Sequence, residues 1–510
     1  MLEGLVVGQL SLVVILIFLG CIIYPSTTCI YNAFFHPLRR FPGPKLWSTT
    51  YLIRHIYAMR GELDWKLQSF HSKYGPVVRF SPGELSFTTE EAWRDIYGHK
   101  SSPLIKDPIV YNSVKMGADG ATSIFNADHD SHVRIRRQLG HAFSDKALRE
   151  QEPRLKSYVD LLILKLRGVA ESQQPTDMVR WYNYTTFDLI GDLAIGKSFN
   201  CLQDNDYHSW VSNLQQGIKI GPYIRTIATY TDFNRLWRIL APSAIQKARL
   251  NHEIYVRQNA EARLSKGISE ERRDFMSYIL KNRGEEGGIT DKEVAANCGF
   301  LIIAGSEAPA TAMSGITYHL LRNRDALQTL TREIRDAFQS EEDIDLSSTS
   351  HRLPYLLACI SEGMRIYPPT PHIPPRRTPP RTMTRIAGHQ VPGWTSVGVH
   401  GLATTTAEWN FHRPKEFIPE RWLPSATQQA SSPFFSDHRD AVQPFSVGPR
   451  SCLGKPLAYN EMRVILTRLL WNFDLELCEE NEGSWLEQRT YTLWDKNPLM
   501  CRLRNIRGDL

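Results

Sequence analysis

The N-terminal stretch Leu5–Tyr24 constrains the fold most strongly, because it is apolar almost without interruption. A helix of roughly twenty residues is about 30 Å long, which matches the hydrocarbon core of a bilayer. Arg39 is the first Lys or Arg of the chain, and only Glu3 carries a charged side chain before it. This pattern predicts a transmembrane anchor over residues 1–24, with the rest of the chain in the cytosol. A cleaved signal peptide, the alternative, normally has a basic start and a shorter apolar stretch.

A proline-rich segment separates this stretch from the body of the chain. Pro37, Pro42 and Pro44 cannot continue a helix, so residues 25–44 are expected to form a stiff, extended linker. No later segment has the composition of a flexible linker, and residues 45–510 are therefore predicted to form one domain. A hydrophobic content of 42% and a charged content of 22% suit a globular domain with a large core.

Charge and cysteine usage exclude several classes of protein. The net charge is +6, but no run of five basic residues occurs, so we expect no nucleic-acid partner. The 8 cysteines are scattered and form no CxxC pair, which argues against a zinc cluster. The same scatter suits a reducing compartment better than a disulfide framework.

The remaining chain is predicted to be mainly α with a minor β-sheet. A capping box at Thr290–Glu293 starts a long buried helix. Apolar residues with helical spacing predict further helices at Val133–Ser144, Glu152–Arg167, Arg180–Ile195, Leu353–Tyr367 and Pro456–Leu470. Alternating residues and turn signals predict a hairpin at Val77–Phe80 and Leu85–Phe87, and short strands at Thr382–Ile386 and Thr395–Val399.

A loop rich in glycine and proline carries Cys452 just before a predicted helix start. Backbone N–H groups and the positive end of the helix dipole favour a thiolate at such a position. Gly448 and Gly454 allow tight backbone geometry and the close approach of a flat ligand, and Arg450 offers a cation for a carboxylate. The loop alone leaves two interpretations open: a thiolate ligand for a metal, or a buried structural cysteine.

Two further patterns are ambiguous when taken alone. Glu362 and Arg365 share a helix face, as a surface ion pair does, but apolar residues precede them and indicate partial burial. His132 and Arg136 also share a helix face, which a solvated basic surface would explain equally well.

The cysteine loop resembles the cytochrome P-450 pattern F-x-x-G-x-R-x-C-x-G, at Phe445, Gly448, Arg450, Cys452 and Gly454. The order of an ExxR element, a Pro-Glu-Arg-Trp element at residues 419–422 and this loop resembles the same family. The resemblance implies the cytochrome P-450 fold, with residues 45–510 forming a haem-binding catalytic domain. It also implies haem b as the cofactor, with Cys452 as the thiolate ligand of its iron.

The resemblance assigns roles to the ambiguous patterns as well. Glu362, Arg365 and Arg421 are expected to form a buried ionic network that fixes the cysteine loop. His132 and Arg136 are expected to meet the haem propionates. Arg376 or Arg377, with Arg376 favoured, resembles another propionate contact.

The helix that begins at the capping box resembles the oxygen-binding helix of the family, with Ala304, Gly305 and Glu307 at its expected positions. It departs from the family at Ala308, where a threonine normally helps to deliver protons and alanine has no hydroxyl. Ser306 and Thr311 are nearby hydroxyls, and Thr311 is a candidate substitute on a similar face.

Pro309 cannot donate a hydrogen bond to the carbonyl of Gly305, so we expect a kink or an opening there. The freed carbonyl could hold a water molecule. We therefore expect ordered water, or a hydroxyl of the substrate, to replace the missing threonine.

The resemblance implies a monooxygenase that oxidises a lipophilic small molecule with O2 and electrons from an NADPH–cytochrome reductase. A cysteine-side face with Arg450, Lys455 and Arg463 is expected to attract this acidic partner. Tyr31–Pro44 and Gly75–Gly98 resemble filamentous-fungal members of secondary metabolism, which indicates a terpenoid or polyketide intermediate and the endoplasmic reticulum membrane.

Two alternatives remain open at this stage. A haem enzyme with Ala308 could catalyse a rearrangement, a coupling or a ring closure, and a haem protein without turnover is the non-enzymatic alternative. Residues around Pro103–Gly120 and Gly217–Tyr230 are expected to line the substrate pocket.

Overall fold

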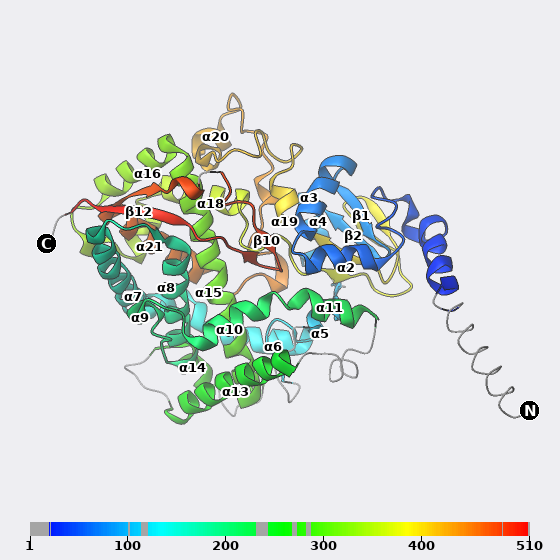
Figure 1. Cartoon of the computed structure of the whole chain (residues 1–510), viewed down its shortest axis with the longest axis horizontal. Coiled ribbons are helices and arrows are strands. Elements are labelled where there is room, and N and C mark those ends of the chain that lie inside the picture. Colours follow the sequence, from blue (N-terminus) through cyan, green and yellow to red (C-terminus); the bar gives the residue numbers. More distant parts are fainter. Residues whose placement is uncertain are drawn as a thin grey trace, which may run out of the picture.

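The computed structural model describes residues 20, 22–99, 103–113, 121–230, 243–267, 273–281, 287–481 and 483–507. The described chain is mainly helical with small sheets, as predicted, and its helices gather in one body beside a sheet-containing part (Figure 1). The α-helices are α2 Tyr51–Met59, α3 Leu63–Tyr74, α4 Glu90–Tyr97, α5 Pro108–Ser113, α6 His129–Gly140, α7 Asp145–Ser172, α8 Met178–Ile195, α9 Cys201–Asp204, α10 Ser209–Ile218, α11 Gly221–Tyr230, α13 Ser243–Ser265, α14 Phe275–Leu280, α15 Asp291–Arg322, α16 Arg324–Ala337, α17 Leu346–His351, α18 Pro354–Ile366, α19 Gly401–Thr405, α20 Pro424–Gln428 and α21 Lys455–Asn472.

Four small sheets are formed by the described strands. The largest has the order β1-β2-β8-β5-β3, in which β2 and β8 are parallel and the other neighbours are antiparallel. A second sheet has the order β4-β12-β9, and β6-β7 and β10-β11 are antiparallel pairs. The strands are β1 Val77–Ser81, β2 Glu84–Phe87, β3 Ile105–Lys106, β4 Thr176–Asp177, β5 Arg376–Arg377, β6 Thr384–Ile386, β7 His389–Val391, β8 Ser396–Val399, β9 Phe473–Leu477, β10 Arg489–Thr490, β11 Trp494–Asp495 and β12 Met500–Asn505.

Short 3₁₀ helices punctuate the loops between these elements. Several of them begin at or near a proline, whose fixed φ suits a first helical position. They are η1 Pro37–Arg40, η2 His141–Phe143, η3 Glu341–Asp343, η4 Pro419–Trp422, η5 Arg439–Ala441, η6 Gly448–Arg450 and η7 Glu479–Asn481.

The N-terminal region differs from the expected extended linker. Residues 22–34 are helical, and η1 follows after His36, whose side chain accepts from the N–H of Leu38. Leu38 and Phe41 are buried in the smaller hydrophobic cluster, so this segment packs against the body of the chain. Most of the expected anchor lies outside the described residues. Within the described residues, no helix combines the length and the apolar character that crossing a bilayer requires.

The predicted helices are confirmed, with shifted ends. α6, α7 and α8 begin before the predicted starts, because Asp128, Ser144 and Asp177 cap them. α15 begins at the predicted capping box, in which the side chains of Thr290 and Glu293 each accept from the other residue's backbone N–H.

The predicted strands are confirmed only in part. β1 and β2 form the expected hairpin. The strand predicted at residues 382–386 corresponds to β6, which pairs with β7, a strand that the sequence analysis missed. The turn between β6 and β7 contains Ala387 and Gly388, both at positive φ. β8 lies apart from that hairpin and joins β2 and β5 in the largest sheet.

The long helix α15 crosses the helical body and contacts α8, α13, α18 and α21 (Figure 1). A glycine permits its approach to α8, because a Cβ at Gly305 would lie 2.7 Å from Cδ1 of Ile190. Side chains of these helices form the larger of two buried clusters, and the smaller one lies under the largest sheet. The packing thus fixes α15 as one wall of the site described next.

Candidate active site

A cavity of about 650 Å³ lies between α15 and the cysteine loop, and most of its lining side chains are apolar. This size is within the usual range for small-molecule sites. Both segments that were expected to line the pocket do so, through residues 106–111 and 217–225. Residues 114–120 of the first segment lie outside the described residues.

Cys452 lines this cavity just ahead of α21, and no other cysteine of the described residues does so. Its N–H donates to the carbonyl oxygen of Phe445 over 2.8 Å, which closes the loop. Gly448 has a φ of +76°, and a Cβ there would collide with the carbonyl oxygen of Tyr97. Gly454 has room for a side chain, unlike Gly448, because a Cβ there would lie 3.9 Å from the Cys452 sulfur, which is an ordinary contact distance. Cys452 itself borders the cavity.

The exposed part of Cys452 faces the cavity, while protein atoms surround its other sides. This burial raises the pKa of the Cys452 thiol, although the N–H groups of Gly454 and Lys455 and the charge of Arg136 lower it. The start of α21 thus lowers the pKa of Cys452, as predicted, but in the chain without a ligand this effect is smaller than the rise caused by burial. A bound metal cation reverses the balance, because a coordinating thiol loses its proton.

Basic side chains gather at one side of the cavity. His132, Arg136, Arg376 and Arg450 line it together, and Lys106 joins them. Burial and the charges of Arg450 and Lys106 lower the pKa of His132 to about 3. In the chain without a ligand, His132 is therefore neutral at pH 7, and the positive charge beside it comes from its neighbours.

The structure distinguishes the two adjacent arginines of β5. Arg376 lines the cavity, donates to the hydroxyl of Tyr111 and lies against the ring face of that tyrosine. Arg377 points elsewhere and forms an ion pair of 2.7 Å with Asp107. Arg376 is thus the arginine that a ligand in the cavity can reach.

The sequence analysis expected the segment that contains Lys106 to line the pocket, but it did not single out this lysine. Its Nζ donates to the carbonyl oxygens of Phe125 and Ala127 over 2.5 and 2.7 Å. Burial, followed by the charges of Arg450 and Arg376, lowers the pKa of Lys106 to about 6. A lone lysine in an irregular segment carries no sequence signal, and only the pairing of β3 with β5 brings it to the cluster.

The helix α15 presents small residues to the opposite side of the cavity. Ala304, Gly305, Ala308 and Pro309 line it. The helix stays continuous through Pro309 to Arg322, so the proline does not end it. The position that a threonine occupies in the family therefore faces the cavity as a methyl group.

Glu307 and Thr311 do not line the cavity, contrary to the expectation for Thr311. Lys496 binds both side chains: its Nζ lies 2.7 Å from Oε2 of Glu307 and donates to Oγ1 of Thr311 over 2.9 Å. The side chains of Glu307 and Lys496 are both 5% exposed, so this is a buried ion pair. Ser306 is also engaged, because its hydroxyl donates to the carbonyl oxygen of Ile302.

The expected ionic network is present and fully buried. Arg365 donates twice to the carboxylate of Glu362 over 2.8 Å, and Arg421 donates to it over 3.1 Å. Trp422 and the N–H of Ile418 donate to the same carboxylate. Burial raises the pKa of Glu362, but Arg365 and Arg421 more than offset it and hold the pKa below its ordinary value.

Asp437 belongs to this network but was not predicted. It forms an ion pair with Arg421 and accepts from the N–H of His412 over 2.7 Å. Asp437 precedes Phe445 by only a few residues, so the network anchors the chain that enters the cysteine loop. An isolated aspartate in a loop offers no pattern by which the sequence could have marked it.

The residues of this cavity fit a haem group. Arg136, Arg376 and Arg450 supply cations for two propionates, Lys106 offers a further hydrogen-bond donor, and Nη1 of Arg450 is buried without a partner. Cys452 borders the same cavity and offers its thiol to an iron there.

Comparison with known proteins decides the family. The family model for cytochrome P450 matches residues 42–501, which is most of the chain. The chain belongs to the cytochrome P450 family. This P450 is similar to fungal relatives, in agreement with the resemblance found in the sequence. It is 46% identical to the trichothecene C-4 hydroxylase of Trichoderma arundinaceum, over 93% of this chain and 94% of the relative.

Other relatives show a similar extent of likeness. The P450 is 43% identical to the cytochrome P450 monooxygenase olcB of Penicillium canescens, over 95% of this chain and 96% of the relative. It is 41% identical to the cytochrome P450 monooxygenase astA of Talaromyces wortmannii, over 94% of this chain and 95% of that protein.

Membership in the family establishes the general activity. This P450 is a monooxygenase of the oxidoreductase class, with a haem whose iron takes a cysteine ligand. It uses O2 and a redox partner and acts on a small molecule. The non-enzymatic alternative is therefore set aside.

Proposed function

We propose that this P450 oxidises a lipophilic terpenoid or polyketide intermediate of fungal secondary metabolism, with Cys452 as the iron ligand. The observation that carries the proposal is one large apolar cavity that joins Cys452 to the small residues of α15. The bound haem supplies the activation of O2 for insertion into a substrate bond. The printed name of the Trichoderma relative, a hydroxylase, supports the reaction type.

The basic cluster has the role of holding the cofactor. Lys106, Arg376 and Arg450 line the cavity and offer donors to the propionates, while Arg136 also holds the cysteine loop through the carbonyl oxygen of Ser451 over 2.6 Å. His132 completes this side as a further hydrogen-bonding group. The neutralisation of this positive cluster by two carboxylates stabilises the bound state.

Proton delivery on the distal side differs from the usual arrangement. Ala308 offers no hydroxyl, and Thr311 is bound to Lys496 away from the cavity. Water held in the cavity, or a hydroxyl of the substrate, takes the place of the threonine. Glu307 then has an electrostatic role behind α15, where Lys496 fixes its carboxylate.

The electron donor is an NADPH–cytochrome reductase that docks on the cysteine side. Lys455 is exposed there and can meet an acidic partner. The sequence analysis also expected Arg450 and Arg463 to attract this partner. Arg450 instead lines the cavity, and Arg463 donates to Ser350 over 2.8 Å, so both side chains are already engaged.

The chain acts at the endoplasmic reticulum membrane, with its catalytic domain in the cytosol. Exposed apolar side chains on the described N-terminal helix and just after it support this placement, among them Ile22, Ile23, Phe34 and Phe35. This helix projects from the body on the side of β1 and β2 (Figure 1).

The test is to express the holoprotein with a reductase and measure the absorption of the reduced, carbon-monoxide-treated form. We expect the red-shifted band of a thiolate-bound haem, and its loss in Cys452→Ser. Retention of the band in this variant would overturn the assignment. A panel of terpenoid and polyketide scaffolds, read out by a mass gain of one oxygen, then tests the substrate class.

A second candidate rests on Ala308, which leaves the described cavity wall of α15 without the usual hydroxyl. The chain could then catalyse a rearrangement, coupling or ring closure on the same skeletons. Product formation without NADPH or reductase would favour this candidate over oxygen insertion.

A further inference from the structure

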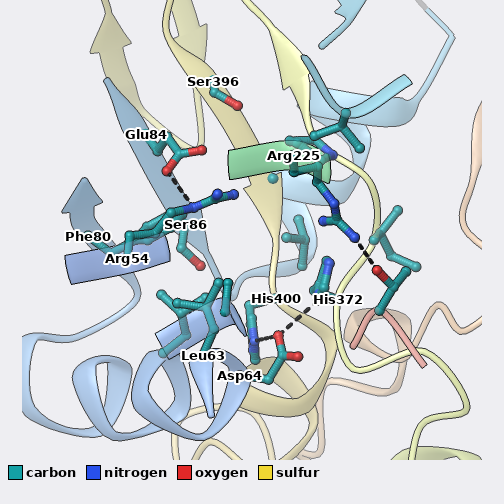
Figure 2. A pocket seen from close by; sticks show the side chains of 18 of the residues that line it. Arg54, Leu63, Asp64, Phe80, Glu84, Ser86, Arg225, His372, Ser396 and His400 are labelled. Atoms are coloured by element: carbon teal, nitrogen blue, oxygen red, sulfur yellow. Dashed lines mark hydrogen bonds and ion pairs between the residues drawn. The ribbon is translucent and has the colours of Figure 1, made fainter. Parts of the chain in front are cut away.

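A second, smaller cavity of about 80 Å³ lies beside the main one. Figure 2 shows side chains that line this smaller cavity. Residues of α2, α3, β2, β8 and α11 enclose it. The two cavities share part of their walls, formed by Val110, Arg225, His372, Ile373, Tyr491 and Thr492. A group at this shared wall can therefore meet a molecule that occupies the main cavity.

The carboxylates of the small cavity already have partners. Glu84 forms an ion pair of 3.1 Å with Arg54. Asp64 lies 2.8 Å from Nδ1 of His372 and 2.9 Å from Nε2 of His400 (Figure 2). Although burial raises the pKa of Asp64, these two histidines hold it well below its usual range.

Arg225 is the exception among the charged groups of this cavity. It extends from α11 in the direction of His372, and no carboxylate of the described residues lies within ion-pair distance of it (Figure 2). Its Nη2 donates to the hydroxyl of Thr492, while its Nε is buried without a partner. Burial, followed by the charge of Arg54, lowers the pKa of Arg225 to about 10, so it stays charged at pH 7.

The partner of this guanidinium is held in an unusual backbone conformation. Thr492 has a φ of +86°, a region that a β-branched residue rarely adopts. In this conformation the hydroxyl of Thr492 accepts from Arg225. The backbone strain has to be offset by favourable contacts elsewhere in the fold. The hydrogen bond that Thr492 accepts helps to hold the guanidinium at the shared wall.

An unpaired cation at the wall of an apolar cavity is costly unless a ligand neutralises it. A carboxylate is the group that matches the planar fork of arginine, because it accepts two parallel hydrogen bonds. Beside Arg225 the main cavity is lined by Ile220, Ile224 and Leu493, and Cys452 lines it as well. The site thus suits an apolar molecule with one acidic group.

We propose that Arg225 binds a carboxylate of the substrate and thereby orients its apolar skeleton toward the reacting centre. This inference rests on the proposed function and narrows its substrate class to lipophilic carboxylic acids. Thr492 acts as a positioning residue, since it touches Arg225 and not the ligand.

The test uses the full-length holoprotein and dodecanoate as the probe, with methyl dodecanoate as its uncharged match. Equilibrium dialysis at pH 7.5 measures both affinities. We expect wild type to bind dodecanoate at least about tenfold more tightly than Arg225→Gln does, because the variant loses a charge-assisted pair. Both proteins should bind the ester with equal affinity, and Arg225→Lys should bind dodecanoate with intermediate affinity.

The double variant Arg54→Gln/Glu84→Gln is the matched control, because it removes a neighbouring ion pair without a change of net charge. It should bind dodecanoate as wild type does, within about twofold. Equal binding of dodecanoate by wild type and Arg225→Gln, or no preference of wild type for the acid over the ester, would overturn the inference. The reduced carbon-monoxide spectrum separates the two failures, since its loss in wild type would overturn the proposed function instead.

Discussion

At the scale of single residues, Lys496 determines the environment of the acidic residue on the distal helix. Glu307 occupies the position that the family pattern predicts, but its carboxylate lies in a buried ion pair behind α15. Lys496 belongs to a short segment near the C-terminus, far from Glu307 in the sequence. No periodicity or motif connects the two, so the pair could be found only from the structure.

Replacement of Lys496 by methionine should destabilise the fold by about 3 kcal/mol, because it removes the cation that forms an ion pair with the buried carboxylate of Glu307. The free energy of unfolding, measured by urea denaturation, tests this expectation. The double variant Lys496→Met/Glu307→Gln should regain part of the loss, since no uncompensated charge remains. Glu416→Gln, which breaks an exposed pair with Arg413, should leave stability nearly unchanged.

A hydroxyl restored at position 308 should change how efficiently electrons are used. Ala308 faces the cavity, so Ala308→Thr places a donor where water or substrate serves in the natural chain. We expect the ratio of product formed to NADPH consumed to change by at least about twofold. Ala312→Thr, one turn further along the same wall, is the control and should leave this ratio unaltered. An unchanged ratio in Ala308→Thr would count against the proton-delivery proposal.

At the scale of secondary-structure elements, the contact between α15 and α8 sets the wall of the cavity. Gly305 stands at its expected position in the family pattern, and it lines the cavity. A Cβ there would also press on Ile190. One residue thus serves both the cavity and the helix packing.

Gly305→Ala should therefore destabilise the protein in spite of the better helix propensity of alanine. The gain in propensity is about 1 kcal/mol, whereas overpacking a core costs about 1–3 kcal/mol. We expect a net loss of about 1 kcal/mol in the free energy of unfolding. Adding Ile190→Ala should abolish this specific loss, because the side chain that the new methyl group meets is gone. A stabilised Gly305→Ala variant would contradict the close approach.

The elements that the sequence predicted share a strong local signal. The helix of Thr290 has a complete capping box, and the hairpin of Val78 and Phe87 has a turn between alternating residues. The network of Glu362 and Arg365 was predictable in part, because both lie on one helix face. Lys106 and Asp437 were not singled out, because their roles depend on contacts between segments distant in the sequence.

At the scale of the whole molecule, buried histidines predict acid sensitivity. Burial lowers the pKa of His71 and His319 from 6.5 to about 3 in the folded chain. Between these values the unfolded chain binds protons that the folded chain does not, so stability is lost as the pH falls below about 6.5. Each such histidine contributes a slope of about 1.4 kcal/mol per pH unit.

Urea midpoints at pH 7.5, 6 and 5 test this dependence. His319→Phe should make the loss of stability with falling pH shallower, because phenylalanine cannot bind a proton. The fold should accept this ring, because His319 stacks on Phe417 and its buried Nε2 has no hydrogen-bond partner to lose. His351→Asn, on an exposed helix end, should leave the slope as in wild type. An equal slope in His319→Phe and wild type would contradict the assignment of the loss to buried histidines.

The short segment from Tyr491 to Lys496 has a consequence for how such enzymes diversify. Its first residues line both cavities, and its last residue holds the acidic group behind the distal helix. A few codon changes in this one stretch would alter which molecules are accepted and how the acidic group is held, while every long helix kept its sequence. Selection for a new product would therefore act largely on substitutions at these few neighbouring positions.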